Sequence, residues 1–457
     1  MFTVRRYHEL RIPGRFEPMQ LAGRLAGSGL FEGHVVYERD GHWWFAGDPL
    51  ADVVLDGATV RSTVDGRTRV EPWAAPSLAQ VGDALARADV RGWRAFGWAA
   101  FELAYAIAGL PRPAAAGEPL LHLFVPRTEV RMGTDELVVR TLDEHRLADV
   151  RDLLREPAGA PSPAAPTPVS VAAAPGRDAY RAGVAAAVAD IRAGLLGKVI
   201  LSREVEVPFD ADLPATYALG RANNTPSRSF LLDLGGWKAA GFSPETVAEV
   251  SPDGRVATLP LAGTRALGGE GGGAADADRR ADLLSDPKEV YEHAASVKLA
   301  CDELEGLCAP GSVAVTEFMR VKERGSVQHL GSRIDGRLGG GRSALDAFAA
   351  LFPAITASGI PKRAAYERIR ALEERPRGLY AGAVLVVSDD GALDSALVLR
   401  AIYQRGGRTW LRAGAGIVAG STPDREYEET CEKLGSIAPY VVRRAREAAP
   451  AEPVAAH

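Results

Sequence analysis

Residues 410–434 read WLRAGAGIVAGSTPDREYEETCEKL, and this stretch decides the fold class. The apolar and glycine-rich part, residues 410–420, predicts a strand whose glycines let backbone N–H groups approach a bound anion. Residues 421–424, STPD, predict a helix start, because small polar residues cap helices and Pro suits the first turn. A dinucleotide fingerprint is disfavoured because no βαβ unit follows.

The helix predicted after this start carries Glu426 and Glu429, three residues apart on one face. A second predicted helix, capped by Asp286, carries Glu289 and Glu292 at the same spacing. Acidic residues in first turns also complement the helix dipole and are then merely solvated. Mg²⁺, in contrast, is held by one or two carboxylates plus waters and substrate oxygens. The pattern therefore leaves two interpretations, solvated helix starts or a magnesium site.

Outward from this stretch, strand and helix patterns are mixed along the whole chain. Residues 34–47, 136–142 and 198–209 show strand patterns, whereas residues 77–88 and 178–196 have helical spacing. Many strand patterns follow one another as hairpins. The sequence therefore predicts an α/β (α+β) fold with large mixed or antiparallel sheets flanked by helices, and not a doubly wound parallel sheet.

A Pro- and Ala-rich segment, residues 156–175, interrupts the periodic patterns and predicts a connector. We expect an N-terminal portion of the fold at 1–170, a catalytic region at 171–445 and a disordered tail at 446–457. Residues 268–275, GGEGGGAA, predict a flexible loop.

The composition excludes several classes of protein. The 457 residues carry 54 Lys and Arg against 59 Asp and Glu, and no basic cluster is interleaved with aromatics, so we expect no nucleic-acid partner. The start of the chain lacks an apolar signal core, and the most membrane-like stretch, residues 98–110, is short and contains Glu102, so we expect a cytoplasmic protein without a membrane partner. The three cysteines show no zinc spacing and predict reduced thiols.

A series of motifs occurs in a specific order after residue 197. They are KVILSR (198–203), GFSPE (241–245), LPLAGTR (259–265), DPKEVYEHA (286–294), GSVQHLGS (325–332), FPAITASGIPK (352–362), RGLYAGAV (377–384), LVLRAIY (397–403) and the stretch at 410–434. This order resembles the chorismate-utilising enzymes, which include anthranilate, aminodeoxychorismate, isochorismate and salicylate synthases. The resemblance implies one two-layered α/β unit, in which the Pro-rich connector is an internal loop, and a requirement for Mg²⁺.

Two positions separate the members of this family. Anthranilate synthases usually have Gln where Lys198 stands, so Lys198 implies water as the nucleophile and no glutaminase subunit. Aminodeoxychorismate synthases carry a nucleophilic Lys where Ala262 stands. The motifs are most similar to salicylate synthases, which implies conversion of chorismate through isochorismate to salicylate. An isochorismate synthase and, less favoured, an anthranilate synthase stay open, as does a non-catalytic protein that binds an anionic metabolite; we expect a monomer.

The resemblance also implies roles for individual residues. Lys198 and Glu245 correspond to the base and the acid of the isomerisation, and burial would keep the amine neutral and the carboxyl protonated. Glu292 and Glu429 correspond to the metal ligands, with Glu289 and Glu426 nearby. Substrate-binding positions correspond to Thr264, His329, Thr356, Tyr380, Arg400, Gly414, Ala415, Gly416 and Lys433. Taken singly, each of these residues also fits a structural role, such as a surface charge or a core histidine.

Overall fold

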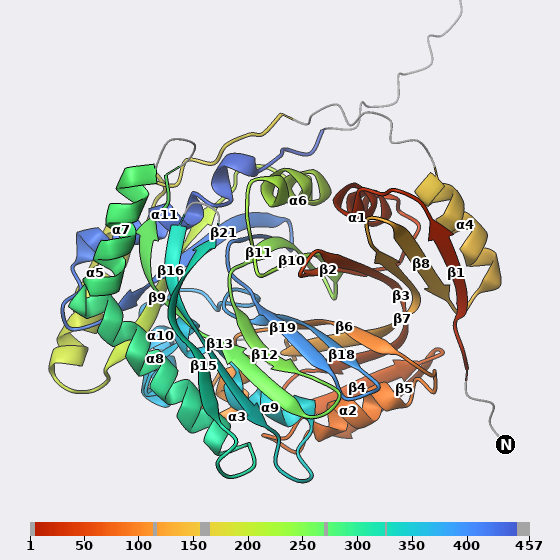
Figure 1. Ribbon diagram of the computed structural model, residues 1–457, viewed down its shortest axis with the longest axis horizontal. Coiled ribbons are helices and arrows are strands. Elements are labelled where there is room, and N and C mark those ends of the chain that lie inside the picture. The colour runs from red at the N-terminus through yellow and green to blue at the C-terminus, as the bar shows by residue number, and fades with distance from the viewer. Residues whose placement is uncertain (1–4, 113–116, 156–164, 269–272, 325–326, 446–457) are drawn as a thin grey trace, which may run out of the picture.

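The computed structural model describes residues 5–112, 117–155, 165–268, 273–324 and 327–445 (Figure 1). The predicted tail at 446–457 and residues 156–164 of the predicted connector lie outside the described residues. Within the described part of the chain, no helix is long and apolar enough to cross a membrane.

The strands pair antiparallel into one continuous network. Their bounds are β1 His8–Pro13, β2 His34–Arg39, β3 His42–Leu55, β4 Thr59–Val64, β5 Arg67–Pro72, β6 Arg94–Ala99, β7 Leu121–Met132, β8 Glu136–Thr141, β9 Lys198–Glu206, β10 Arg228–Leu234, β11 Trp237–Ser243, β12 Thr246–Val250, β13 Arg255–Leu259, β14 Leu261–Ala266, β15 Ala314–Arg324, β16 Val327–Arg337, β17 Gly359–Ile360, β18 Ala383–Ser388, β19 Leu393–Leu397, β20 Ala401–Arg405 and β21 Arg408–Ile417. The prediction of large antiparallel sheets flanked by helices is confirmed.

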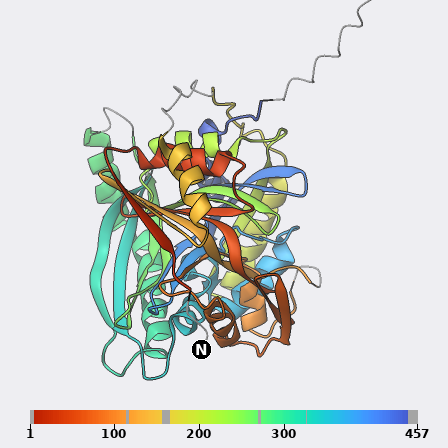
Figure 2. The same ribbon diagram turned by 90° about the vertical axis from the view of Figure 1, so that its right-hand side faces the viewer.

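Helices cover the outer faces of these sheets (Figure 1). Their bounds are α1 Pro18–Gly27, α2 Ala79–Ala86, α3 Leu103–Ile107, α4 Glu144–Arg155, α5 Arg177–Arg192, α6 Leu213–Ala222, α7 Gly273–Ser285, α8 Pro287–Glu305, α9 Ala344–Leu351, α10 Lys362–Leu372 and α11 Pro423–Leu434, with 3₁₀ turns η1 Ile355–Ala357 and η2 Ala438–Tyr440. Helix α1 contacts both α4 and α6 at one end of the molecule (Figures 1 and 2).

Two branches of strands start from the long strand β3. One branch runs through β2, β10, β11, β20, β21 and β9 to β17. The other runs through β7, β6, β18, β19, β12 and β13 to β16, which also pairs with β14 and β15. Strands β2, β3, β7 and β6 from before the connector therefore lie together, with strands from after the connector on both sides of them in the same sheet.

The connector also packs on the C-terminal part of the chain. The N–H of Thr167 donates to the carbonyl of Val441 at 2.6 Å, and the N–H of Val169 donates to that of Ala438 at 3.0 Å. One hydrophobic core extends from Val35 to Tyr427, so the two sequence portions share their core as well as their sheet.

Some predicted element bounds differ from the structure. Helix α5 ends at Arg192 and not at residue 196, because Gly194 takes a φ of 77° that terminates it. The loop prediction at 268–275 was wrong for its last residues, since α7 begins at Gly273, and residues 269–272 lie outside the described part. The three cysteines are free thiols, as predicted, with Cys308 buried and Cys301 and Cys431 half-buried.

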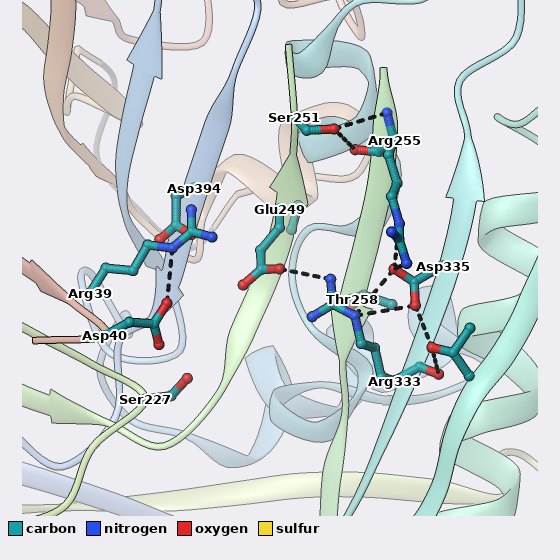
Figure 3. Close-up of polar contacts among 12 residues, drawn as sticks. Arg39, Asp40, Ser227, Glu249, Ser251, Arg255, Thr258, Arg333, Asp335 and Asp394 are labelled. Carbon is teal, nitrogen blue, oxygen red and sulfur yellow. Dashed lines mark hydrogen bonds and ion pairs between the residues drawn. The ribbon is translucent and has the colours of Figure 1, made fainter. Parts of the chain in front are cut away.

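A ladder of ion pairs joins the two branches, and Figure 3 shows Arg39, Asp394, Glu249 and Arg333 of this ladder. Asp394 of β19 accepts from Arg39 of β2 at 2.9 Å and from Arg228 of β10 at 2.8 Å. Glu249 of β12 accepts from Arg228 at 2.5 Å and from Arg333 of β16 at 3.0 Å. Arg228, Glu249 and Asp394 are largely buried, and each pairs with two opposite charges, which offsets the cost of removing it from water.

Candidate active site

A cavity lies between β9, β14, β16, β21, the first two turns of α8 and the C-terminal half of α11. Most residues that the sequence singled out line it, although they come from distant parts of the chain. They are Lys198, Glu245, Thr264, Glu289, Glu292, His329, Thr356, Tyr380, Arg400, Gly414, Gly416, Glu429 and Lys433. Two predicted residues do not line the cavity, namely Ala415 and Glu426. Strand alternation explains why Ala415 does not line the cavity. Its methyl group points into the core, on the face opposite to its two glycine neighbours.

Lys198 is the first residue of β9 and is only 3% exposed. Its Nζ lies 2.8 Å from Oε1 of Glu292, but the contact lacks hydrogen-bond geometry, so the ammonium has no satisfied hydrogen bond. The neutral amine expected at this position stays a prediction, and the nearest carboxylate is that of Glu292. Lys198 has donors left to offer a ligand in the cavity.

Glu245 lies between β11 and β12 and is buried, with 4% exposure. Burial raises the pKa of this carboxyl to about 8, although a hydrogen bond from Thr356, a backbone N–H from Leu261 and the charges of Lys198 and Lys433 act against the shift. The hydroxyl of Thr356 donates to Oε1 of Glu245 at 2.5 Å. A carboxyl with this pKa is largely protonated at neutral pH and is able to donate a proton.

His329 and Arg400 form the cationic end of the cavity. The guanidinium of Arg400 donates to Nε2 of His329 at 2.7 Å, and since Arg cannot accept, Nε2 is the unprotonated nitrogen. Nδ1–H then faces the carbonyl of Gly263 at 3.2 Å and the hydroxyl of Thr264 at 3.1 Å. Burial and the charge of Arg400 hold the pKa of His329 well below its usual range, so the ring is neutral.

Arg400 is buried without a carboxylate partner among the described residues. Its guanidinium also donates to the carbonyl of Arg324 at 2.8 Å. Burial lowers the pKa of Arg400 to about 10, with a further contribution from the charge of Arg324. Its pKa stays above neutral pH, so the group remains a cation and leaves an unmatched positive charge at the cavity wall.

Strand β21 presents two glycines to the cavity. Gly414 and Gly416 pair with Ser202 and Ile200, whose N–H groups donate away from β21, to Glu373 and Ser358. The N–H groups of both glycines therefore point away from β9, along an edge without a further strand partner. Space also requires glycine, since a Cβ on Gly416 would lie 2.6 Å from Oε1 of Glu292. The edge suits a close approach by an anion.

The first turn of α8 supplies one acidic pair. Asp286 caps the helix as predicted and accepts from the N–H of Lys288 at 2.8 Å. The side chain of Glu289 does not complete a capping box but accepts from Arg265 at 2.9 Å. Burial, with the nearby carboxylate of Glu292, raises the pKa of Glu289.

The first turns of α11 supply the other acidic pair. Burial and the charge of Glu429 raise the pKa of Glu426, which lies behind the cavity with 0% exposure. Burial acts in the same direction on Glu429, but the ammonium of Lys433 at 2.7 Å outweighs it and holds the pKa of Glu429 below its usual range. Lys433 also donates to the carbonyl of Gly414 at 3.0 Å. The helix therefore ties an acidic cluster to the glycine edge.

The acidic cluster fits a hard cation that shares its ligands with a substrate. In the described part of the chain, no group of three or more His, Cys, Asp or Glu side chains is placed to hold a metal by itself. Mg²⁺ needs only one or two carboxylates, and Glu292 and Glu429 both face the cavity. Oε2 of Glu426 is also buried without a hydrogen-bond partner, so this oxygen is able to accept a further contact.

Two cavity-side residues were missed by sequence reasoning. Lys288 lies 3.4 Å from Glu426 and 4.0 Å from Glu289, so its ammonium sits within the acidic cluster. Its position in the DPKEV motif, directly before Glu289, was the available signal. Arg412 lines the cavity from β21 and contacts Glu373, a pairing over 39 positions that no local pattern indicates.

The chain resembles known proteins over nearly its full length. Residues 33–439 match the pattern of the chorismate binding enzyme family. A salicylate synthase of Mycolicibacterium paratuberculosis is 46% identical over 436 residues, which cover 95% of this chain and 96% of that protein. An anthranilate synthase component 1 of Halobacterium salinarum is 41% identical over 273 residues, which cover 58% of this chain and 51% of that protein.

Solved structures agree on the fold. Anthranilate synthase component I from Streptococcus pneumoniae superimposes with a TM-score of 0.72 at 26% identity, covering 87% of this chain and 92% of that one. The menaquinone-specific isochorismate synthase from Escherichia coli shares the fold with a TM-score of 0.71 at 20% identity, covering 95% and 94% of the two chains. With a matching family pattern over most of its length and a cavity built from the matching motifs, this chain belongs to the chorismate binding enzyme family.

Proposed function

We propose that this protein is a salicylate synthase, which adds water to carbon 2 of chorismate, expels the hydroxyl of carbon 4 to form isochorismate, and then eliminates pyruvate to give salicylate. The 46% identity to a salicylate synthase over 95% of the chain supports this reaction over those of the other family members. The same likeness supports an enzyme that works without a glutaminase subunit. Lys198 agrees with this, because it stands where the ammonia-using anthranilate synthases usually have glutamine.

The observation that carries the proposal is a buried acid and a lysine in one cavity. Isomerisation needs one group to take a proton from the attacking water and another to protonate the departing hydroxyl. Glu245, with its pKa raised to about 8, suits the second task. Lys198 suits the first only as a neutral amine, which requires Glu292 to have another cationic partner.

That requirement links the lysine to the proposed metal. Glu292 and Glu429 would hold Mg²⁺, with Glu289 and Glu426 as neighbouring carboxylates, and the ion supplies positive charge that stabilises the ring carboxylate as the hydroxyl leaves. With Glu292 holding the ion, Lys198 would be without this ion-pair partner. Lys433, 2.7 Å from Glu429, orients that carboxylate and adds positive charge near the substrate.

Another part of the cavity wall suits the carboxylate of the enolpyruvyl group. Arg400 offers a guanidinium with no carboxylate partner in the described residues, and Gly414 and Gly416 offer backbone N–H groups. A guanidinium and backbone amides in a buried site bind carboxylates with charge-assisted hydrogen bonds. Tyr380, Thr264 and His329 complete this wall.

The test is incubation of the purified chain with chorismate and Mg²⁺, followed by chromatographic identification of products. Salicylate and pyruvate in equal amounts support the proposal. Isochorismate without pyruvate would instead make the protein an isochorismate synthase. Anthranilate as the main product with ammonium would make it an anthranilate synthase, and unchanged chorismate would favour a protein that only binds the metabolite.

A further inference from the structure

One buried carboxylate behind the cavity collects an unusual number of donors. Glu373, at the C-terminal end of α10, has a side chain that is 3% exposed. Its Oε1 accepts from the N–H and the hydroxyl of Ser202, both at 2.8 Å, and from Arg377 at 2.6 Å. Its Oε2 accepts from Arg377 at 2.9 Å and from Arg412 at 2.7 Å. The carboxylate does not line the cavity, but each donor belongs to a segment that does.

Arg377 extends these contacts to two pieces of the cavity wall. Its guanidinium donates to the carbonyl of Ala357 and to the carbonyl of Ile200, each at 2.8 Å. Ile200 and Ala357 line the cavity, and Ala357 directly follows Thr356, the residue that donates to Glu245. Through Arg377, Glu373 is therefore linked to the strand that carries Lys198 and to the residue after Thr356, which hydrogen-bonds Glu245.

Arg412 and Arg377 also enclose a third piece of the wall. Each guanidinium carbon lies 5.5 Å from the centroid of the Tyr380 ring, within cation–π distance. Arg412 additionally donates to the hydroxyl of Ser202 at 2.9 Å and to the carbonyl of Pro376 at 2.9 Å. The orientation of Tyr380 therefore depends on two arginines that share one counter-ion.

We propose that Glu373 is a positioning residue for the proposed reaction: it holds β9 with Lys198, the η1 turn with Thr356, and Tyr380 in one fixed geometry. It acts through Arg377, Arg412 and Ser202 and touches no substrate. This inference rests on the proposed function for its assay. Proton transfer and substrate alignment are sensitive to shifts of about 1 Å. Loss of the contacts of Glu373 is therefore expected to lower kcat even when the fold is retained.

The molecule contains a matched control. Glu249 also bridges two arginines, Arg228 and Arg333, and is part of the ladder in Figure 3, but neither it nor its partners line the cavity. Replacing Glu249 leaves Arg228 paired with Asp394 and the partly exposed Arg333 paired with Asp335. Replacing Glu373 is more severe, because Arg377 and Arg412 are buried and share it as their close carboxylate. Glu249 is therefore a control for the loss of a bridging carboxylate away from the cavity.

The experiment compares Glu373→Asp, Ser202→Ala and Glu249→Gln with the wild type, measuring kcat and KM for chorismate per folded molecule, and thermal unfolding. Glu373→Asp keeps the charge but is one methylene too short to reach Ser202 and both arginines together. We expect kcat to fall about tenfold in Glu373→Asp and about threefold in Ser202→Ala. Glu249→Gln is expected to unfold at a lower temperature with unchanged kcat and KM.

Two results would overturn the proposal: wild-type kcat and KM in both Glu373→Asp and Ser202→Ala, or an equal loss of kcat in Glu249→Gln. Glu373→Asp and Ser202→Ala both leave a buried carboxylate for the two arginines. They therefore remain informative where Glu373→Gln fails to fold. The wild-type assay tests the proposed function separately. If the wild type turns over no chorismate, calorimetric affinity for chorismate replaces kcat, and unchanged affinity in Glu373→Asp refutes the positioning role.

Discussion

The two ends of the cavity carry opposite charge on different kinds of element. The acidic end is built from the first turns of two helices, and lysines already accompany its carboxylates: Lys198 on Glu292, Lys288 beside Glu426 and Lys433 on Glu429. The cationic end is built from strand and loop residues, and Arg400 there has no carboxylate partner in the described part of the chain. A substrate carboxylate can bind Arg400 without displacing a protein group, whereas a metal ion must compete with lysines for the glutamates.

Breaking the acidic end should have the largest effect. We expect excess EDTA to abolish turnover, and Glu292→Gln and Glu429→Gln each to remove most activity, because a neutral amide is a poor ligand for a hard ion. Calorimetric Mg²⁺ affinity should fall by more than about tenfold in both. Glu428→Gln is the control, since Glu428 is exposed on the same helix. Near-normal rates at low Mg²⁺ in both variants would refute a metal site at this end.

Replacing the two proposed proton-transfer residues should have the second-largest effect on activity. Lys198→Ala and Glu245→Gln are each expected to slow isochorismate formation from chorismate by on the order of a hundredfold or more, the usual scale for losing an acid or base. Pyruvate release from supplied isochorismate should be less affected, because a concerted hydrogen transfer within the substrate needs positioning more than it needs proton donors on the protein. Product time courses from both substrates measure the difference. Equal losses in the two assays would mean that these residues shape the cavity and do not move protons.

Breaking the cationic end should have a smaller effect. Arg400→Met is expected to lower kcat/KM for chorismate by roughly tenfold to a hundredfold, because one or two charge-assisted hydrogen bonds are lost. Steady-state kinetics would be compared with those of Arg405→Met, whose arginine lies in the following strand and pairs with Glu118 outside the cavity. An unchanged kcat/KM would place the substrate carboxylate elsewhere.

The smallest expected effect is the pH dependence of kcat/KM, which depends on Glu245. The pKa of Glu245 is raised to about 8, and the proposed acid acts in its protonated form, so activity should be retained below that pH and lost above it. At pH 9, one unit above this pKa, kcat/KM for isomerisation should be about tenfold below its plateau. In Glu245→Gln the residual rate should lack this alkaline limb. If the limb persists in the variant, another group is responsible for it.

Local patterns predicted the parts of this site that depend on neighbours in sequence. The cap at Asp286 and the acidic pairs on two helices followed from capping and helical spacing. Strand alternation was also available and would have removed Ala415 from the list, since Gly414 and Gly416 on either side face the cavity. The raised pKa of Glu245 was expected from a buried turn, and its burial agrees with that expectation.

The sequence by itself determined the family, the antiparallel α/β class and the chemical types at the site, because ordered motifs, periodicity and helix caps are local properties of the chain. Only the tertiary structure decided which charges meet. Lys198 contacts Glu292, Lys288 reaches Glu426, and Glu373 gathers Arg377 and Arg412, pairings that depend on how β9, α8, α10, α11 and β21 pack. Burial and the distance between charges set protonation and strength of pairing, and both are properties of the packed molecule that no sequence spacing contains.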